Sequence, residues 1–291
     1  YTYDSNGNIL NKKEYEYTLD ESLANKTITN TITYEYENQN YKDQLTSYNG
    51  RLITYDEIGN PTWYNEKELI WQNGRQLRDF NDWDNKQSIT YKYNENGIRT
   101  QKTVNGYEVT NYYLDGTNVI YEQTGNNIIY YTYDSNDNIL GLNYNGTKYY
   151  YIKNAQNDVI GILDNNLNQI VSYVYDSWGK ILSIKDANGN NITNENNIGI
   201  INPYRYRSYR YDTETGFYYL QTRYYNPEWG RFLNFDNYMG EIGKTYSHNG
   251  YAYCKNNPIN MIDSDGNLAI TISMALYAAF HLLKKNYRPL R

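Results

Sequence analysis

Short runs of alternating polar and apolar residues fill the first two thirds of the chain, and each run ends at a cluster of Asp, Asn and Gly. In one clear example, Tyr131–Tyr133 is followed by the polar cluster 134–138 and then by the apolar pair Ile139-Leu140. Successive side chains of a strand point to opposite faces, so the pattern Y-x-Y places two rings on one face. The polar cluster supplies residues that cap their own backbone or adopt a positive φ. Each unit therefore predicts a β-hairpin.

The same unit recurs at a regular spacing. Copies begin at Tyr1, Thr54, Tyr91, Tyr131 and Tyr173, and degenerate copies begin at Tyr34, Tyr112 and Tyr149. From position 36 onward, the second aromatic residue advances by 18 to 24 residues per copy, except for one interval of 38 residues around a weak copy near Trp71. A single hairpin is only marginally stable, so consecutive hairpins must join edge to edge. The pattern predicts an all-β fold of antiparallel hairpins over residues 1–185.

The composition agrees with an ordered β protein. The chain has 291 residues, of which 39 are Tyr and only 5 each are Phe and Trp. A mean hydropathy of −0.91 would usually indicate disorder. Disordered chains are poor in aromatic residues, however, whereas tyrosine buries its ring and keeps its hydroxyl hydrogen-bonded. The net charge is −6, and the repeats contain no long basic stripe, so we do not expect a nucleic-acid partner.

A second and more specific pattern covers residues 203–266. Its stretches are Pro203–Arg207, Asp212–Leu220, Thr222–Pro227, Gly230–Leu233 with Asp236, and Tyr251–Gly266. In this order they resemble the RHS repeat-associated core domain. The upstream units resemble the YD repeats of the same RHS family, which is found in bacterial wall-associated, polymorphic-toxin and toxin-complex proteins and in teneurins.

The resemblance implies a fold and a domain order. YD repeats over 1–185 would wind as a spiral sheet into a partial hollow shell, followed by an Asn-rich linker at 186–202. The core at 203–266 would close one end of the shell as a plug, and 267–291 would be a short variable tail. Because the chain starts without Met or a signal peptide, we interpret it as an excerpt of a longer polypeptide with further repeats upstream.

The resemblance also implies a function. Family members enclose or present a C-terminal toxin payload, are secreted or held at the cell surface or cell wall, and act in bacterial competition. Only 25 residues follow Gly266, which is too few for an enzymatic toxin, so the payload is expected to be absent or truncated. The expected partners are the chain's own payload or the upstream repeats.

Some family members cleave themselves through an aspartyl-protease-like site in the core. Asp236 and Asp263 match the two aspartates, Arg231 is the candidate to hold one of them as an anion, and the cut would fall at Asn267 and Leu268. Two carboxyl groups close together can divide the acid and base roles.

This sequence departs from the self-cleaving pattern, which has Pro after the first aspartate and Leu before the cut. Here Asn237 follows Asp236, Ser264 follows the second aspartate, and Asn267 precedes the cut. These departures favour plain structural roles, namely turns for the aspartates and a buried ion pair for Arg231. Self-cleavage remains the enzymatic alternative.

Two binding alternatives are open. The tyrosine-lined strands could form an adhesin surface for carbohydrate or cell-wall polymer, although periodic aromatic residues are more often structural ladders between strands. The arginines Arg205, Arg207 and Arg210 could bind phosphate. Because they alternate with tyrosines, we expect cation–π contacts and acid pairing within the sheet instead.

No cofactor or metal site is predicted. Cys254 is the single cysteine and is interpreted as a core residue, and His248 and His281 lack the spacing of zinc ligands. P-loop, dinucleotide and nucleophile-elbow motifs do not occur in the sequence.

The tail contains an uncharged run from Leu268 to Leu283. Its Ala, Leu and Met content predicts a C-terminal helix, and its 16 residues are short for a membrane span. We expect this helix to be buried in the shell. Membrane contact through its basic flank is the alternative.

Overall fold

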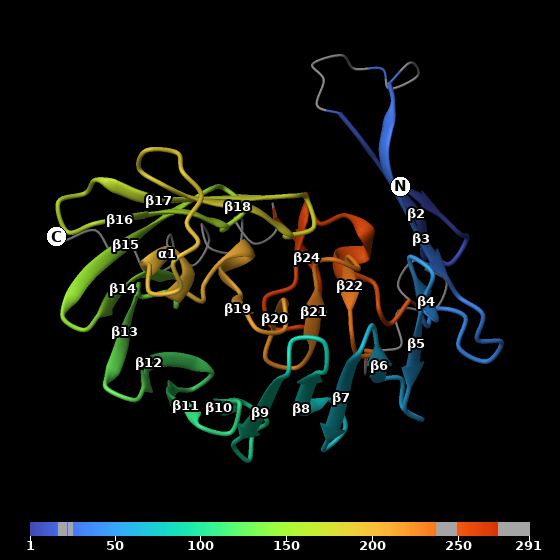
Figure 1. Cartoon of the computed structure of the whole chain (residues 1–291), viewed down its shortest axis with the longest axis horizontal. Coiled ribbons are helices and arrows are strands. Elements are labelled where there is room, and N and C mark those ends of the chain that lie inside the picture. The colour runs from blue at the N-terminus through green and yellow to red at the C-terminus, as the bar shows by residue number, and fades with distance from the viewer. Residues whose placement is uncertain (17–21, 23–25, 237–248, 273–291) are drawn as a thin grey trace, which may run out of the picture.

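The computed structural model describes residues 1–16, 22, 26–236 and 249–272, and within them the protein is nearly all antiparallel β (Figure 1). Eighteen strands form one long sheet, which we call the wall. The wall strands are β1 Thr2–Tyr3, β2 Ile9–Tyr15, β3 Ile28–Glu35, β4 Ser47–Tyr48, β5 Arg51–Tyr55, β6 Pro61–Tyr64, β7 Lys67–Gln72, β8 Gln76–Asp82, β9 Gln87–Tyr93, β10 Arg99–Val104, β11 Glu108–Asp115, β12 Asn118–Thr124, β13 Asn127–Tyr133, β14 Ile139–Tyr144, β15 Thr147–Lys153, β16 Val159–Leu163, β17 Gln169–Tyr175 and β18 Ile181–Asp186. Each strand pairs with its neighbour in sequence, from β1–β2 through β17–β18.

The predicted turns share one hydrogen-bond pattern. In the turn after β13, Asp134 Oδ1 accepts from the backbone N–H groups of Asn136 and Asn138, and Asp137 between them has a φ of 62°. The same side-chain cap occurs in eight turns, which start at Asp4, Asp56, Asn94, Asp134, Asn154, Asp164, Asp176 and Asp186. In each of them the fourth residue has a positive φ. The Asp/Asn therefore fixes the turn, and glycine is favoured three residues later.

In six of the units the second aromatic residue ties its strand to the segment before it. The Tyr93 hydroxyl at the end of β9 donates to the Leu77 carbonyl at the start of β8, over 2.7 Å. Equivalent bonds join Tyr36 to Ile9, Tyr55 to Leu45, Tyr133 to Val119 and Tyr175 to Val159. In the weak copy, Trp71 supplies its indole N–H to the Pro61 carbonyl at 2.6 Å. We call these six contacts the aromatic locks.

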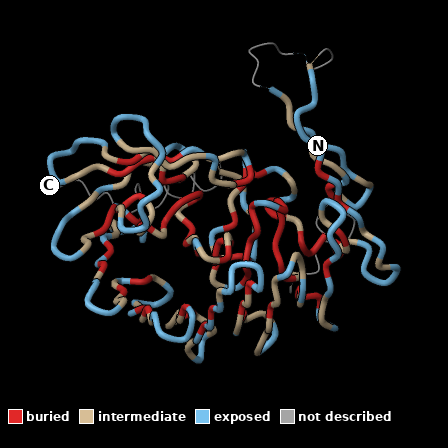
Figure 2. The backbone as a smooth tube through the Cα atoms, in the orientation of Figure 1, coloured by how far each residue is buried: buried red, intermediate tan, exposed pale blue. Residues whose placement is uncertain are grey.

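Residues 203–236 and 249–271 form a compact plug on the inner face of the wall (Figures 1 and 2). Its four-stranded sheet is built from β19 Arg210–Asp212, β20 Phe217–Tyr219, β21 Tyr224–Asn226 and β22 Arg231–Phe232, and β23 Met261–Ile262 pairs with β24 Ile270–Thr271. A single helical turn, α1 Ile198–Ile201, and two short 3₁₀ turns at Tyr206–Ser208 and Tyr253–Asn256 complete the described elements. All residues of β20, β21 and β22 are buried.

Buried charges hold the plug to the wall. Arg99 of β10 donates through both terminal nitrogens to Asp212 of the plug, and its guanidinium lies 4.5 Å from the ring centre of Tyr219. Arg210 of β19 pairs with Glu122 of β12 through one terminal nitrogen, Nη2. Because an unpaired buried charge is costly, these pairs fix the orientation of the plug once it is seated.

The two ends of the wall approach each other around the plug. The ring of Tyr1 lies 5.7 Å from that of Trp178 in the β17–β18 turn, and Lys12 of β2 lies 3.6 Å from Asp176. Plug tyrosines reach the same turn, since Tyr225 donates to the Trp178 carbonyl at 2.6 Å. Along this stretch the wall therefore encircles the plug.

The all-β repeat fold expected from the sequence is confirmed. Of the run Leu268–Leu283 expected as a helix, Ile270–Thr271 instead forms strand β24 and pairs with β23, and residues from 273 onward lie outside the described residues. The stretch 186–202, expected as an Asn-rich linker, contains a capped turn and α1. At its end Asn202 is fully buried and accepts from the Tyr151 hydroxyl at 2.6 Å. The end of this stretch, residues 198–202, is therefore packed against the wall, whereas residues 187–196 are mostly exposed.

The turn after β16 provides a test of the repeat geometry. Leu167 occupies the position where most copies have glycine, with a φ of 64° and a side chain 67% exposed. A left-handed conformation costs a non-glycine residue about 1–2 kcal/mol. We expect Leu167→Gly to raise the free energy of unfolding by about 1 kcal/mol in urea denaturation. The control Leu182→Gly, in the exposed face of β18, should lower it, and a destabilised Leu167→Gly protein would contradict the assignment.

Candidate functional site

Two aspartates that are distant in sequence meet at one arginine. Arg223, directly before β21, lies 2.9 Å from Asp236 and 3.3 Å from Asp263, measured from its Nη2 to the carboxylate oxygens. The arginine is 4% exposed, and its guanidinium stacks 3.6 Å from the ring centre of Phe232. The plug therefore brings the two predicted carboxyl groups together, with Arg223 between them.

The predicted cleavage segment lies against the same groups. Asp263 Oδ1 accepts from the Gly266 N–H at 2.9 Å, and Arg223 Nε donates to the Gly266 carbonyl. Gly266 has a φ of 80°, and a Cβ at this position would lie 2.8 Å from Thr222 Oγ1 and 2.9 Å from the Leu220 carbonyl. Only glycine fits here, because both the backbone conformation and the space exclude a side chain.

The two residues of the predicted cut leave this pocket toward solvent. Asn267 is exposed and binds Asp265 through its backbone N–H at 3.1 Å and its side-chain amide at 2.9 Å. Leu268 is 59% exposed. A cavity of about 580 Å³ beside Asp236, Gly266 and Asn267 opens between the plug and the turns of the wall.

The electrostatics distinguish Asp263 from an ordinary carboxylate. Burial raises the pKa of Asp263 to about 6, against the opposing influence of Arg223. Burial also lowers the pKa of Arg223 itself. A carboxyl group that keeps its proton to near-neutral pH, next to a second carboxyl group, has the properties of a general acid.

Arg231 does not fill the role that the sequence suggested for it. It donates to the Tyr36 hydroxyl and to the Asp43 carbonyl at 2.6 Å, and its guanidinium lies 5.2 Å from the ring centre of Tyr251. Arg231 thus fastens the plug to the wall near β3, and Arg223 is the arginine between the aspartates. Arg223 stands among buried aromatic residues of the plug, and a buried cation requires an acidic partner. Its aromatic neighbours in the sequence were the signal that could have identified Arg223 as the arginine between the aspartates.

The remaining arginines behave as expected for packing. Arg205 lies over the Tyr173 ring at 5.1 Å, Arg207 pairs with Asp158 at 3.1 Å, and Arg210 pairs with Glu122. These contacts confirm cation–π and acid pairing. Cys254 is buried, and burial raises the pKa of its thiol to about 12, so it is an inert core residue.

Exposed tyrosines on the wall form a cross-strand ladder. The rings of Tyr113 and Tyr121 are stacked with centres 4.0 Å apart and planes 10° apart, and Tyr130 follows at 5.2 Å from Tyr121. Tyr113 and Tyr121 cover one face of each other, whereas Tyr130 is tilted by 35° against Tyr121. Part of the ring surface on which a sugar would stack is therefore occupied along this ladder.

Among the described residues, no group of three His, Cys, Asp or Glu side chains is placed to hold a metal ion. No helix within the described part of the chain has the length and apolar character of a membrane span. His248 and His281 lie outside the described residues.

The fold is thus a wall of capped hairpins around an aromatic plug, and known proteins resemble this chain in sequence or in fold. The chain is 38% identical to the tRNA3(Ser)-specific nuclease WapA of Bacillus spizizenii and 36% identical to the tRNA nuclease WapA of Bacillus subtilis, over 277 residues in each case. Both alignments cover 91% of this chain but only 11% of the relative, so the chain spans about a tenth of the length of these proteins.

Solved structures show the same fold. The complex TcdB2-TccC3-Cdc42 matches 92% of this chain and 15% of the solved chain, with a TM-score of 0.58 and 19% identity. No protein-family model matches the sequence. The WapA similarity and the shared fold together support an RHS/YD-repeat family for this chain.

Asp263 predicts a specific dependence of stability on pH. Its pKa is raised by folding from 3.8 to about 6, so the folded protein binds this proton more tightly than the unfolded chain does. The resulting stabilisation is complete below about pH 4 and is lost as the pH rises through 6, in total roughly 3 kcal/mol.

In urea titrations, the wild-type protein should therefore lose stability relative to Asp263→Asn as the pH rises from 4 to 6.5. The difference between the two proteins isolates Asp263 from all other carboxyl groups. A pH-independent difference would show that Asp263 titrates normally.

Proposed function

We propose that this chain is the wall-and-plug part of a secreted or surface-exposed RHS-type protein that encloses or presents a C-terminal toxin payload. The observation that supports the proposal is the plug, which packs on the inner face of the wall and contacts both of its ends, through Tyr225 with Trp178 and through Asn249 with Asn8. Buried pairs such as Arg99 with Asp212 bind it on one side, and the Tyr225–Trp178 contact binds it beside the β17–β18 turn.

The relatives support the toxin part of the proposal. The WapA relatives are named as tRNA nucleases, and this chain aligns with about a tenth of their length. For this chain we propose a delivery role and not the nuclease activity of the relatives, because a wall around a plug suits an enclosure better than a catalytic centre for RNA. The target, the payload and the cell-surface location belong to the proposal.

Limited proteolysis of the complete polypeptide that contains this chain tests the enclosure. We expect segments that follow the plug to resist trypsin in the wild-type protein. In Asp212→Ala they should become sensitive, because Arg99 is left buried without its partner, at a cost of about 3–5 kcal/mol. The matched control Asp164→Ala removes an exposed turn cap of the wall and should keep the protection. Equal digestion of the wild-type and Asp212→Ala proteins would refute the enclosure.

A second candidate function, self-cleavage, is favoured by the meeting of Asp236 and Asp263 at Arg223 beside Gly266. In this reaction water attacks the Asn267 carbonyl, one carboxylate accepts the water proton, and the other carboxyl group protonates the departing Leu268 nitrogen. The raised pKa of Asp263 suits the acid role, which leaves Asp236 as the base. The products are a new carboxyl terminus at Asn267 and a new amino terminus at Leu268.

The chain with a C-terminal affinity tag tests this second function. We expect the tag to separate from the chain in the wild-type protein and to stay attached in Asp236→Asn and Asp263→Asn. Asp164→Asn makes the same chemical change in a wall turn and should leave cleavage intact. Mass spectrometry of the released fragment should give Leu268 as its first residue. A single full-length tagged band from pH 4 to 8 would exclude self-cleavage.

A further inference from the structure

Three tyrosines on the outer face of the wall occupy directly opposite positions on neighbouring strands. Tyr113 of β11 is paired with Tyr121 of β12, and Tyr121 with Tyr130 of β13. Opposite side chains of an antiparallel sheet project from the same face, with Cβ atoms about 4.5–5.5 Å apart. The neighbouring residues Tyr112 and Tyr131 point the other way and are buried. The three phenols make up the tyrosine ladder and stand side by side on the solvent side of the wall.

Within the ladder, the rings of Tyr113 and Tyr121 lie almost face to face. Their centres are 4.0 Å apart and their planes differ by 10°, and no other pair of tyrosine rings in the described part of the chain is as close or as parallel. Tyr130 lies farther away, with its ring centre 5.2 Å from that of Tyr121 and a tilt of 35°. The pairing of β11 with β12 keeps the close rings together, so a reaction between them requires no diffusional encounter.

Both rings of the close pair can be reached from solvent. Tyr113 is 39% exposed, and Tyr121 is half-buried. Reduced solvation raises the pKa of Tyr121, and the nearby phenols of Tyr113 and Tyr130 raise it further. The Tyr121 phenol is therefore protonated at neutral pH, so removal of an electron from it also releases a proton.

Proximity and access to solvent occur separately at other tyrosines. The rings of Tyr225 and Tyr253 in the plug have centres 4.1 Å apart and planes 32° apart, but both side chains are fully buried. Tyr107 is 77% exposed, yet it has no aromatic neighbour among the described residues. The first pair is out of reach of an oxidant in solution, and the second phenol has no partner within the chain to react with.

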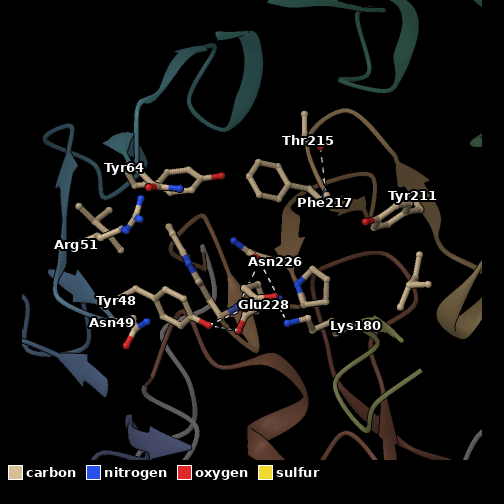
Figure 3. Close-up of a pocket in the computed structure, with 16 residues that line it drawn as sticks. Tyr48, Asn49, Arg51, Tyr64, Lys180, Tyr211, Thr215, Phe217, Asn226 and Glu228 are labelled. Carbon is tan, nitrogen blue, oxygen red and sulfur yellow. Dashed lines mark hydrogen bonds and ion pairs between the residues drawn. The ribbon is translucent and has the colours of Figure 1, made fainter. Parts of the chain in front are cut away.

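The cavity of about 460 Å³ between wall and plug also contains tyrosines, but they are not stacked on one another (Figure 3). Tyr48 and Tyr64 line it from β4 and β6, and Tyr211 lines it from β19. Tyr64 instead packs edge-on against Trp229, with ring centres 4.9 Å apart. Within the described residues, the close, parallel and solvent-accessible pair of phenols is therefore the one in the ladder.

We propose that Tyr113 and Tyr121 are a site of oxidative cross-linking, where a one-electron oxidant such as a haem peroxidase with hydrogen peroxide joins the two phenols as dityrosine. Each phenol loses one electron and one proton and becomes a phenoxyl radical, whose unpaired electron is shared between the oxygen and the ring carbons ortho and para to it. The para carbon carries the side chain, so the two radicals couple through ortho carbons.

The reaction balances with this oxidant alone. The new carbon–carbon bond takes one unpaired electron from each ring, and the hydrogen on each coupled carbon then moves to the phenol oxygen, which restores both aromatic rings. The pair loses two electrons and two protons in total, and hydrogen peroxide takes them up to become two molecules of water. The link ties β11 to β12 covalently, and it depends neither on the enclosure role nor on self-cleavage.

Oxidation of the 291-residue chain with a haem peroxidase and hydrogen peroxide, at low protein concentration, tests the proposal. We expect the blue fluorescence of dityrosine in chains that still migrate as monomers. Digestion before aspartate separates Tyr113, in peptide 84–114, from Tyr121, in peptide 115–133. Mass spectrometry should therefore find these two peptides joined, with two hydrogen atoms lost, whereas a link from Tyr121 to Tyr130 would lie inside the second peptide.

Conservative variants locate the link. Tyr113→Phe and Tyr121→Phe keep the stacked ring but lack the phenol, so each should abolish the joined peptides while the circular dichroism stays that of the wild type. The matched controls Tyr107→Phe and Tyr130→Phe remove more exposed phenols and should leave the link intact. Two results would overturn the proposal, namely an oxidised wild-type chain without the joined peptides, although N-acetyltyrosine is coupled in a parallel reaction, or joined peptides that persist in Tyr113→Phe.

Discussion

The fold depends on the phenol hydroxyl of tyrosine reaching a neighbouring carbonyl. The inner face of so polar a wall can be buried only if its large aromatic side chains also donate hydrogen bonds to buried backbone carbonyls. The aromatic locks do this near the start of β2, β4, β6, β8, β12 and β16, as Tyr93 does for Leu77 and Tyr175 for Val159. Phenylalanine would fill the same volume but would leave the carbonyl without a donor, at a cost of about 1–3 kcal/mol. This explains why the aromatic residues of the chain are mostly tyrosine and why tryptophan can replace it at position 71.

The same phenols make buried arginines tolerable. Arg99 lies within 5.3 Å of the ring centres of Tyr91, Tyr112 and Tyr219 while it binds Asp212. The ring faces supply negative potential around the buried guanidinium, and the carboxylate balances the charge. An aromatic interior of this kind can therefore hold ion pairs that fix the position of the plug, which apolar contacts alone would leave free to slide.

The parts of the structure that were predictable from sequence are the local ones. The hairpins and their caps depend on residues within about five positions of each other, as in the turn at Asp134, so periodicity was sufficient to find them. The sequence suggested Arg231 as the arginine between the aspartates. The true partners of Arg231 depend on how β22 packs against the wall, and this long-range contact cannot be read from residue spacing. The burial of Asn202 was missed for a related reason, since an Asn-rich stretch has the composition of a linker. The pairing of Asp236 with Asp263 was anticipated from a family resemblance, and the residues alone would not have indicated it.

Regularity in the wall also determines where function can reside. Within the repeats, the turn caps and aromatic locks satisfy most polar groups, so the hairpins offer few free donors to a ligand. Strained or electrostatically perturbed groups appear where the plug meets the wall: the carboxyl of Asp263, whose pKa burial raises, and the constrained Gly266. The candidate site at Asp236 and Asp263 therefore lies in the plug, beside the turns of the wall. A change in plug sequence can alter this site without disturbing the repeats, whereas a change in the repeats affects the wall against which the site is packed.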